Sequence, residues 1–276
     1  MSEFDPFVEE WVSYAKNPRY TLVEKCLKLA QVLEFPDLDL VFYINKLNSM
    51  GEELRNSISD VKNPTYLISM LNEYMFDTLG FDGNRDDYYN PRNNFLNVVI
   101  ERKTGIPITL SIIYIQLGSY IGLDLRPVGF PGHFLVKYSE EMILDPFNGG
   151  ALLDVDDLQE ILDNTYGNGV QFNPEYLNEI EPEKILVRIL RNLKNSYMQS
   201  FNYKTAMHCI NMVLGLLPDD PEEIRDKGVV QSRLLQNDLA IKSLEKYLEL
   251  APEAYDVDYV LDLIRSIKER SNQQST

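Results

Sequence analysis

The sequence contains only two histidines, His133 and His208, and these limit where general-base catalysis can occur. His133 precedes an expected strand, and Asp145 lies twelve residues further along, across an expected hairpin. A histidine and a carboxylate on neighbouring antiparallel strands can form the orienting half of a nucleophile–base–acid triad. A half-buried histidine bonded to a carboxylate is also an ordinary structural arrangement, so both interpretations of this pair stay open. His208 and Cys209 are adjacent in a predicted helix and point about 100° apart, which excludes them as a base and nucleophile pair.

The first third of the chain predicts helices. Apolar residues recur at helical spacing over residues 7–79, as in Leu22, Cys26 and Leu29, and indicate four helices. Asn63-Pro64 is a typical helix start, because Asn suits the N-cap and Pro the first helical position. Cys26 lies on an apolar stripe and is predicted to be part of the core rather than a nucleophile. A polar loop over 80–93 and a short helix over 94–103 follow.

A charge-free segment occupies the middle of the chain. Residues 105–123 carry no charge over nineteen positions, close to the ~20 that a membrane-spanning helix needs. The segment contains Pro107, Thr109, Ser111 and several glycines, which suit a helix buried in a globular core better than one facing lipid. We therefore expect a buried helix over 107–121, ended by Gly122 in the left-handed conformation, and no membrane span.

The period then changes to that of short strands. Three apolar or alternating segments at 125–130, 134–138 and 142–144 predict an antiparallel meander. A helical layer followed by a small antiparallel sheet is an α+β domain. Asp154 is the expected N-cap of a further helix over 154–163, and a loop follows over 166–174.

The last hundred residues contain an internal repeat. Ala206 and Ala240 are separated by 34 positions, and so are Pro218 and Pro252. This spacing resembles two tetratricopeptide repeats, over about 187–220 and 221–254, with a capping helix over 256–270. The small Ala permits close helix packing, and the Pro ends each second helix. We expect two domains, 1–180 and an all-α repeat domain 181–276; an ordinary helical tail with coincidental spacing is the alternative.

Composition excludes several classes of protein. The 276 residues include 26 Lys and Arg against 43 Asp and Glu, a net charge of −17, which disfavours binding to nucleic acid. Two cysteines and no basic, apolar leader predict a cytoplasmic protein without disulfides. Asp82, Asn84 and Asp86 are spaced as in a calcium loop, but Asp87 and Asn93 replace its Gly and Glu. No metal site and no nucleotide or other cofactor is expected.

Four stretches carry a family resemblance: DTLGFDGN, YYNPRNNFLNVVIERKTGIPITLSIIY, GFPGHFLVKY and ILDPFNGG. Together they resemble the SirB-type subgroup of the transglutaminase-like superfamily, whose members join such a domain to C-terminal tetratricopeptide repeats. The resemblance implies a transglutaminase- or papain-like core, in which a central helix packs on a small antiparallel sheet. In that superfamily a catalytic Cys begins the central helix within a G-x-C pattern, and a His and an Asp follow on successive strands. His133 and Asp145 match the last two.

The same resemblance implies that this chain has no cysteine at the catalytic position of the superfamily. Counting back from Gly122, the G-x-C pattern falls on Gly105, Ile106 and Pro107, so the resemblance places Pro107 at the position of the nucleophile. Proline has no nucleophilic atom, and thioester chemistry is impossible there. Ser111 lies one turn further, about 5.4 Å deeper, and is a weak substitute, because a buried serine in a helix more often bonds to its own backbone.

Two polar residues before the central helix, Asn97 and Glu101, are candidates for the same cleft, without an established role to carry over. Three functions follow. The first is a non-catalytic interaction or regulatory module that binds a protein partner, basic in character, through a repeat groove. The second is a hydrolase, deamidase or peptidase that uses His133 and Asp145 with a nucleophile other than cysteine. The third is a structural adaptor in which only the repeats matter. The oligomeric state is not predicted.

Overall fold

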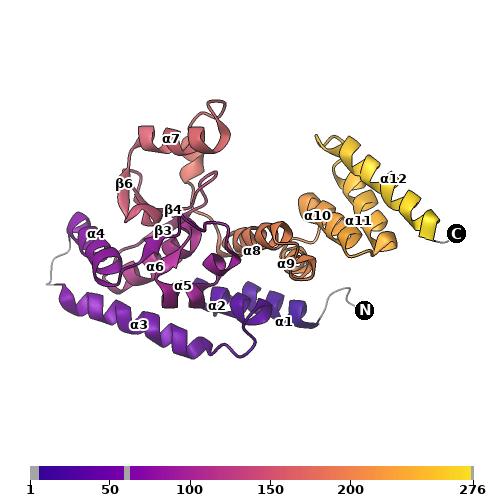
Figure 1. Ribbon diagram of the computed structural model, residues 1–276. Coiled ribbons are helices and arrows are strands. Elements are labelled where there is room, and N and C mark those ends of the chain that lie inside the picture. Colours follow the sequence, from indigo (N-terminus) through magenta and orange to yellow (C-terminus); the bar gives the residue numbers. More distant parts are fainter. Residues whose placement is uncertain (1–5, 59–62, 275–276) are drawn as a thin grey trace. The chain divides into compact units, whose positions relative to one another are not determined.

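A computed structural model describes residues 6–58 and 63–274 (Figure 1). Contacts between Cα atoms divide this chain into two compact units. Asn17–Leu186 form the first, called here the core unit. The second, called the repeat unit, combines α1 (Pro6–Lys16) with the chain from Val187 onward.

The first helix departs from the expected domain division, which placed all N-terminal helices in residues 1–180. Val8, Trp11 and Ala15 recur along one side of α1 and are buried. This face packs on α9 (Tyr203–Leu216), where a side chain on Gly215 would collide with Val12. The sequence pattern shows that α1 has an apolar face, but not which distant helix covers it.

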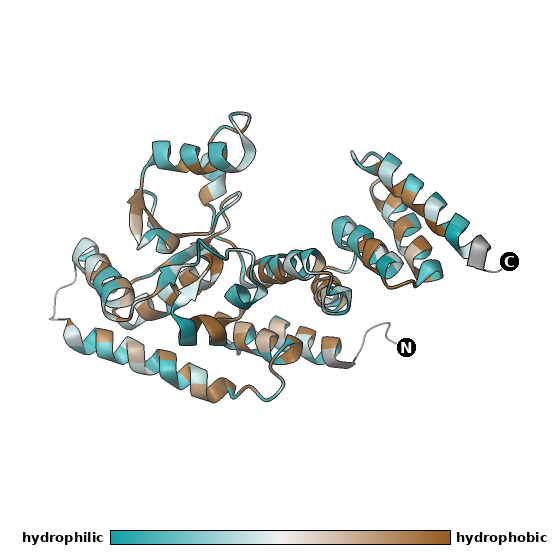
Figure 2. Ribbon diagram, viewed as in Figure 1, coloured by the Kyte–Doolittle hydropathy of each residue, from teal (hydrophilic) through white to brown (hydrophobic). Residues whose placement is uncertain are grey.

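The helical layer of the core unit contains α2 (Leu22–Leu33), α3 (Leu40–Ser57) and α4 (Pro64–Asn72), which continues into a π-helical turn, Glu73–Thr78. With α1, these are the four helices that the periodicity predicts. Asn63 caps α4 by accepting a hydrogen bond from the Tyr66 N–H, as expected from Asn63-Pro64. The outer helices α3 and α12 alternate between hydrophilic and hydrophobic residues along their length, as helices with one buried face do (Figure 2).

A polar loop joins this layer to the central helix. It contains β1 (Asp82–Gly83) and a 3-10 turn, Pro91–Asn94, and leads into α5 (Leu96–Arg102). β1 pairs in parallel with β2 (Thr104–Gly105), directly before the central helix. Lys103, at φ 58°, takes the left-handed conformation that turns the chain from α5 into β2.

The central helix α6 (Pro107–Tyr120) is buried at every position from Pro107 to Tyr114. Gly122 follows it at φ 79°, the left-handed conformation that the sequence predicts. The absence of charge in residues 105–123 is explained by burial of α6 against α3 and the sheet, not by contact with lipid. Among the helices described here, none is long and apolar enough to cross a membrane.

The sheet has four antiparallel strands in chain order: β3 (Arg126–Val128), β4 (Leu135–Ser139), β5 (Met142–Asp145) and β6 (Ala151–Leu153). The first three match the expected meander. α6 contacts β3 and β4, and α7 (Val155–Tyr166) shares an apolar cluster with the sheet that includes Leu135, Ile143 and Leu158. This arrangement confirms the α+β class.

Taken in chain order, the helices of the repeat unit make two pairs: α8 (Pro182–Gln199), which belongs to this unit from Val187 onward, with α9, and α10 (Pro221–Arg233) with α11 (Asn237–Leu250). α10 contacts both α9 and α11, and α12 (Val257–Gln274) contacts α11. Ala206 and Ala240 are fully buried, and a side chain on Gly228 would collide with Leu244. Small residues therefore permit the close approach of helices in the second pair.

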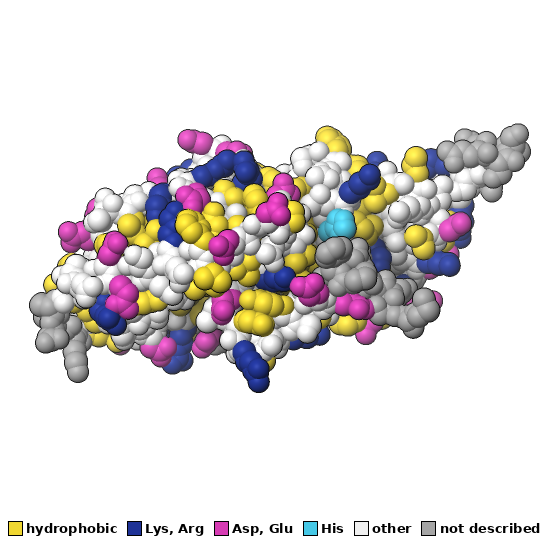
Figure 3. Space-filling view, turned by 90° about the horizontal axis from the view of Figure 1, so that it is seen from below, with side chains coloured by type: hydrophobic (Ala, Val, Ile, Leu, Met, Phe, Trp, Pro, Cys, Tyr) yellow, Lys and Arg dark blue, Asp and Glu magenta, His cyan; other side chains and the backbone are white. Residues whose placement is uncertain are grey.

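One face of the surface is shown in Figure 3. Lysine and arginine side chains there are interspersed with aspartate and glutamate among hydrophobic residues. Phosphate backbones bind to clustered positive charge, so this face lacks the continuous basic surface that nucleic-acid binding requires.

The two glycines before β6 allow the cost of close packing to be tested by substitution. Gly149 and Gly150 both have positive φ, at 67° and 73°. A side chain on Gly150 would overlap the amide of Asn72, which donates a hydrogen bond to the Gly150 carbonyl at 3.1 Å. A side chain on Gly149 would have no atom within 4 Å. Gly149→Ala should lower the free energy of unfolding by about 1 kcal/mol and Gly150→Ala by about 1–3 kcal/mol more. Urea denaturation of both variants measures this difference; equal losses would contradict it.

Candidate functional site

His133 and Asp145 form a hydrogen-bonded pair. His133 lies in the turn before β4, Asp145 ends β5, and the two strands are neighbours in the sheet. His133 Nε2 is 2.9 Å from Asp145 Oδ2. The carboxylate is 1% exposed and the imidazole 13%. The structure thus brings together the two residues that the sequence predicts as a pair, with the histidine oriented through Nε2.

Several hydrogen-bond donors stabilise the charge of the Asp145 carboxylate. Its carboxylate also accepts from the Phe147 N–H at 3.0 Å and from Asn148 Nδ2 at 2.7 Å. Burial alone would raise the pKa of Asp145, but the hydrogen bonds from His133, Asn148 and Phe147 outweigh it and hold the pKa below its ordinary value. The carboxylate is therefore ionised at neutral pH and fixes the orientation of the ring.

Sequence reasoning missed the residues around the pair. The Phe147 ring meets the His133 ring edge-on, with centroids 6.0 Å apart, and Tyr88 meets Phe147 in the same way. Arg85 stacks on Phe147 at 4.9 Å and donates to the Phe147 carbonyl and to Asn148 Oδ1. The polar loop 80–93 therefore contacts the turn that follows Asp145. Its Arg and Tyr residues were the available signal, but nothing local shows that they contact a turn about sixty positions away.

The start of α6 is held as an ordinary helix N-terminus. Pro107 is its first residue and is buried. Thr109 Oγ1 accepts from the Ile106 N–H at 3.1 Å and lies 3.0 Å from the Asn93 carbonyl oxygen. Gly105, two positions before Pro107, pairs with Gly83 of β1. A side chain on Gly83 would collide with the Phe147 ring. The β1–β2 pairing and the Phe147 ring thus link the helix start to His133.

The remaining nucleophile candidates are enclosed. Ser111 is 0% exposed, and its Oγ has no hydrogen-bond partner within the described residues. It makes neither the bond to a backbone carbonyl that we expected nor one to His133. Cys26 is buried on α2, as predicted, and burial raises the pKa of its thiol to about 12. Cys209 is buried in the repeat unit.

Asn97 and Glu101 lie elsewhere than expected. Both line a pocket of about 560 Å³ whose lining includes neither His133, Asp145 nor Pro107. Glu101 points toward α3, where Lys46 Nζ is 2.8 Å from its Oε1. The structure places these two residues on a pocket that His133, Asp145 and Pro107 do not line, and the ion pair with Lys46 turns Glu101 toward α3.

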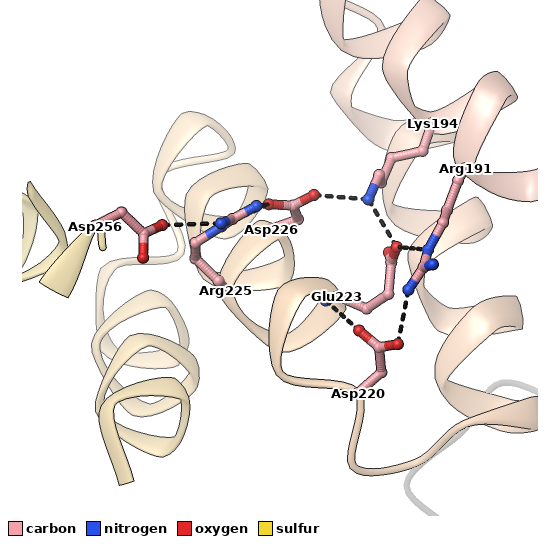
Figure 4. Close-up of polar contacts among 7 residues, drawn as sticks. All are labelled: Arg191, Lys194, Asp220, Glu223, Arg225, Asp226 and Asp256. Atoms are coloured by element: carbon pink, nitrogen blue, oxygen red, sulfur yellow. Dashed lines mark hydrogen bonds and ion pairs between the residues drawn. The ribbon is translucent and has the colours of Figure 1, made fainter. Parts of the chain in front are cut away.

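A charged cluster joins the helices of the repeat unit (Figure 4). On α8, Lys194 donates to Glu223 at 2.7 Å and to Asp226 at 2.6 Å, and Arg191 reaches Glu223 at 3.0 Å. The chain of ion pairs continues from Asp226 through Arg225 to Asp256, before α12, at 2.9 and 2.8 Å. Lys194 and Glu223 are almost fully buried. The cluster therefore joins α8 to α10 through ion pairs.

The turns within the two helix pairs share an unusual feature. Phe201 and Leu235, separated by 34 positions, have φ of 59° and 60°. Each follows a helix and forms a Schellman motif: the next residue donates to the carbonyl five positions earlier, Asn202 to Tyr197 and Gln236 to Gln231. Gly or Asn usually occupies this position. Both side chains are large and exposed, at 76% and 72%.

Comparison with known proteins identifies the class of this fold. The chain matches the transglutaminase-like superfamily over residues 42–191 and a tetratricopeptide repeat over residues 193–265. It therefore belongs to the transglutaminase-like superfamily, with C-terminal repeats, as the sequence motifs indicated.

Several relatives share most of this chain. A UPF0162 protein of Xylella fastidiosa is 37% identical over 233 residues, which cover 82% of this chain and 83% of the relative. A UPF0162 protein of Vibrio cholerae is 28% identical over 235 residues, covering 84% and 86%. F-box only protein 21 of Homo sapiens is 29% identical over 195 residues, covering 64% of this chain and 29% of that protein. No solved structure shows significant similarity.

The depressed pKa of Asp145 predicts a pH dependence. Because the folded-state pKa lies below the unfolded-state value of about 4, the carboxylate stabilises the fold above that pH and this contribution is lost as pH falls through the folded-state value. Asp145→Asn should cost about 2 kcal/mol at pH 7, and its difference from the parent should shrink below about pH 4. Urea denaturation across pH, with exposed Asp156→Asn as control, measures this. A difference independent of pH would count against the ionised pair.

The buried cluster makes a second prediction. Glu223→Gln keeps the side-chain size but leaves the Lys194 ammonium buried with only Asp226 as partner. We expect a loss of about 3 kcal/mol in the free energy of unfolding, since breaking a buried pair strands its other charge. Glu222→Gln, exposed on the same turn of α10, is the matched control and should change stability little. Similar losses in the two variants would show that the cluster does not stabilise the unit.

Proposed function

We propose that this protein is a non-catalytic member of its superfamily that acts as a protein-interaction module and contacts its partner through the repeat unit. The observation that carries the proposal is the pair of exposed, left-handed residues Phe201 and Leu235. A left-handed conformation costs an ordinary residue about 1–2 kcal/mol, and neither side chain recovers this cost by burial within the unit. A contact surface for a partner would explain why backbone strain is retained at equivalent positions of the two repeats.

The core unit supports the non-catalytic half of the proposal. The position that the superfamily pattern gives to a cysteine is Pro107, which supplies no nucleophile. Among the described residues, Cys26 and Ser111 are enclosed in the core. The His133–Asp145 pair then acts as a structural device, which joins the turn before β4 to the end of β5. The cytoplasm is the proposed location.

An enzyme is the second candidate, and the His133–Asp145 hydrogen bond is the observation that favours it. The bond occupies Nε2 and fixes the orientation of the ring, so Nδ1 is the ring nitrogen that would have to act as the general base. A hydrolase, deamidase or peptidase would need a nucleophile other than cysteine or an activated water beside that ring. A stable His133→Ala variant that loses turnover would favour this function, whereas loss of folding alone would favour the structural role.

The repeat contact is tested by replacing both exposed residues with the residue that the turn prefers. Phe201→Asn with Leu235→Asn removes two apolar side chains and relieves the backbone, so stability should stay the same or rise by up to about 1 kcal/mol. Capture of partners from native cytosol on the full chain should lose the specific partner with this double variant.

Tyr166→Asn is the matched control, because Tyr166 is an exposed aromatic residue, 53% exposed, on α7 of the core unit. It should retain the partner. Partners captured equally by all three proteins, at unchanged stability, would refute a contact through these turns. A partner lost with Tyr166→Asn alone would place recognition in the core unit instead.

A further inference from the structure

A pocket of the core unit lies apart from the His133–Asp145 pair. It encloses about 560 Å³, within the range of roughly 300–1,000 Å³ typical of small-molecule sites. Three segments form it: the α2–α3 connection at residues 34–38, the first turn of α3 at Tyr43, and the stretch from Arg92 through Arg102. Arg92, from the stretch YYNPRNN, and Glu101 and Arg102, from the stretch ERKTGIP, line it, and the proposed function makes no use of these three residues.

The Asn97 side chain is the first feature that indicates a ligand. Asn97 lines the pocket and is only 4% exposed. Within the described chain its amide has no hydrogen-bond partner, and Oδ1 is enclosed. An unsatisfied buried amide costs about 1–3 kcal/mol. Since no bond fixes the amide, it can turn either its oxygen or its nitrogen toward the pocket and pair with a complementary amide-type edge.

Two arginines are the second feature. Arg92 and Arg102 both line the pocket and are exposed, and within the described residues neither forms an ion pair. The chain has 43 acidic residues for 26 basic ones, and other arginines, such as Arg85 and Arg225, are paired. Two unpaired guanidinium groups on one pocket are therefore unexpected. Each presents a fork of donors that matches a carboxylate or a phosphate.

The carboxylates of the pocket do not neutralise these arginines. Glu101 is bound by Lys46 at 2.8 Å and by the Tyr43 hydroxyl. Glu34 already has a partner in the protein, and Asp37 is exposed on the α2–α3 connection. Between the charged groups the wall is apolar, with Phe35, Leu38 and Val98.

We infer that this pocket binds a small anionic ligand. Its carboxylate or phosphate is held by Arg92 and Arg102, its amide- or nucleobase-type edge pairs with Asn97, and its apolar body packs on Phe35 and Leu38. The site needs neither His133 nor the repeat unit, so it is independent of the function proposed above.

Two matched pairs of probes test the inference on the full chain. N-acetylphenylalanine and its neutral amide differ only in the carboxylate, and AMP and adenosine differ only in the phosphate. Amide NMR spectra recorded during titration should show saturable shifts around Asn97 and Arg102 with the acid, with AMP, or with both, and little change with the neutral partner of each. The acid and AMP arms distinguish a carboxylate ligand from a phosphate ligand, and either supports the inference.

Variants of the pocket sharpen this test. Arg92→Gln and Arg102→Gln should each weaken binding roughly tenfold or more, whereas Arg126→Gln, an exposed arginine of the sheet, should not. Asn97→Leu removes the unsatisfied amide at similar volume, so it should keep or raise stability while it abolishes saturable binding. The inference fails if neither anion gives saturable shifts near Asn97, if the neutral probes bind equally well, or if Asn97→Leu leaves binding unchanged.

Discussion

The buried carboxylate of Asp145 connects the turn before β4 to the turn that follows β5. Taking a charge out of water is costly, and the cost is met here by donors from three places: the His133 ring, the Phe147 backbone and the Asn148 side chain. Arg85 extends this arrangement by bonding to the same turn from the polar loop. One buried charge thus determines where the loop, the turn and the end of β5 meet. The pair persists for a structural reason even if no reaction uses it.

The start of the central helix is stabilised by packing rather than by polar contacts of its first side chain. Every residue from Pro107 to Tyr114 is buried, so the start of α6 is part of the core. A proline there satisfies the helix geometry without needing a backbone donor. Replacing Asp145, by contrast, would leave the donors around it without their acceptor. The start of α6 and the Asp145 carboxylate therefore contribute to the fold in different ways, one by apolar packing and one by hydrogen bonds.

The sequence predicts what local physics controls. Helices and their ends follow from periodicity and capping residues, as Asn63, Gly122 and Asp154 show. The three-residue strand β6 escaped prediction because it is too short to alternate and is fixed by pairing with β5. The His133–Asp145 pair was accessible because a hairpin brings neighbouring segments together. The places of Asn97 and Glu101 were not, since the rotation of a seven-residue helix against distant elements decides them.

The packing of α1 has a consequence for synthesis on the ribosome. Lys16 Nζ contacts the Gly215 carbonyl, 199 positions away, so the helix is translated long before its cover exists. At 5–20 residues per second, roughly 10–40 s pass before α9 emerges. During that interval Val8, Trp11 and Ala15 form an apolar stripe without its native cover. Such a stripe is a natural substrate for chaperones that hold nascent chains, and closure of the repeat unit must wait for the last third of the polypeptide.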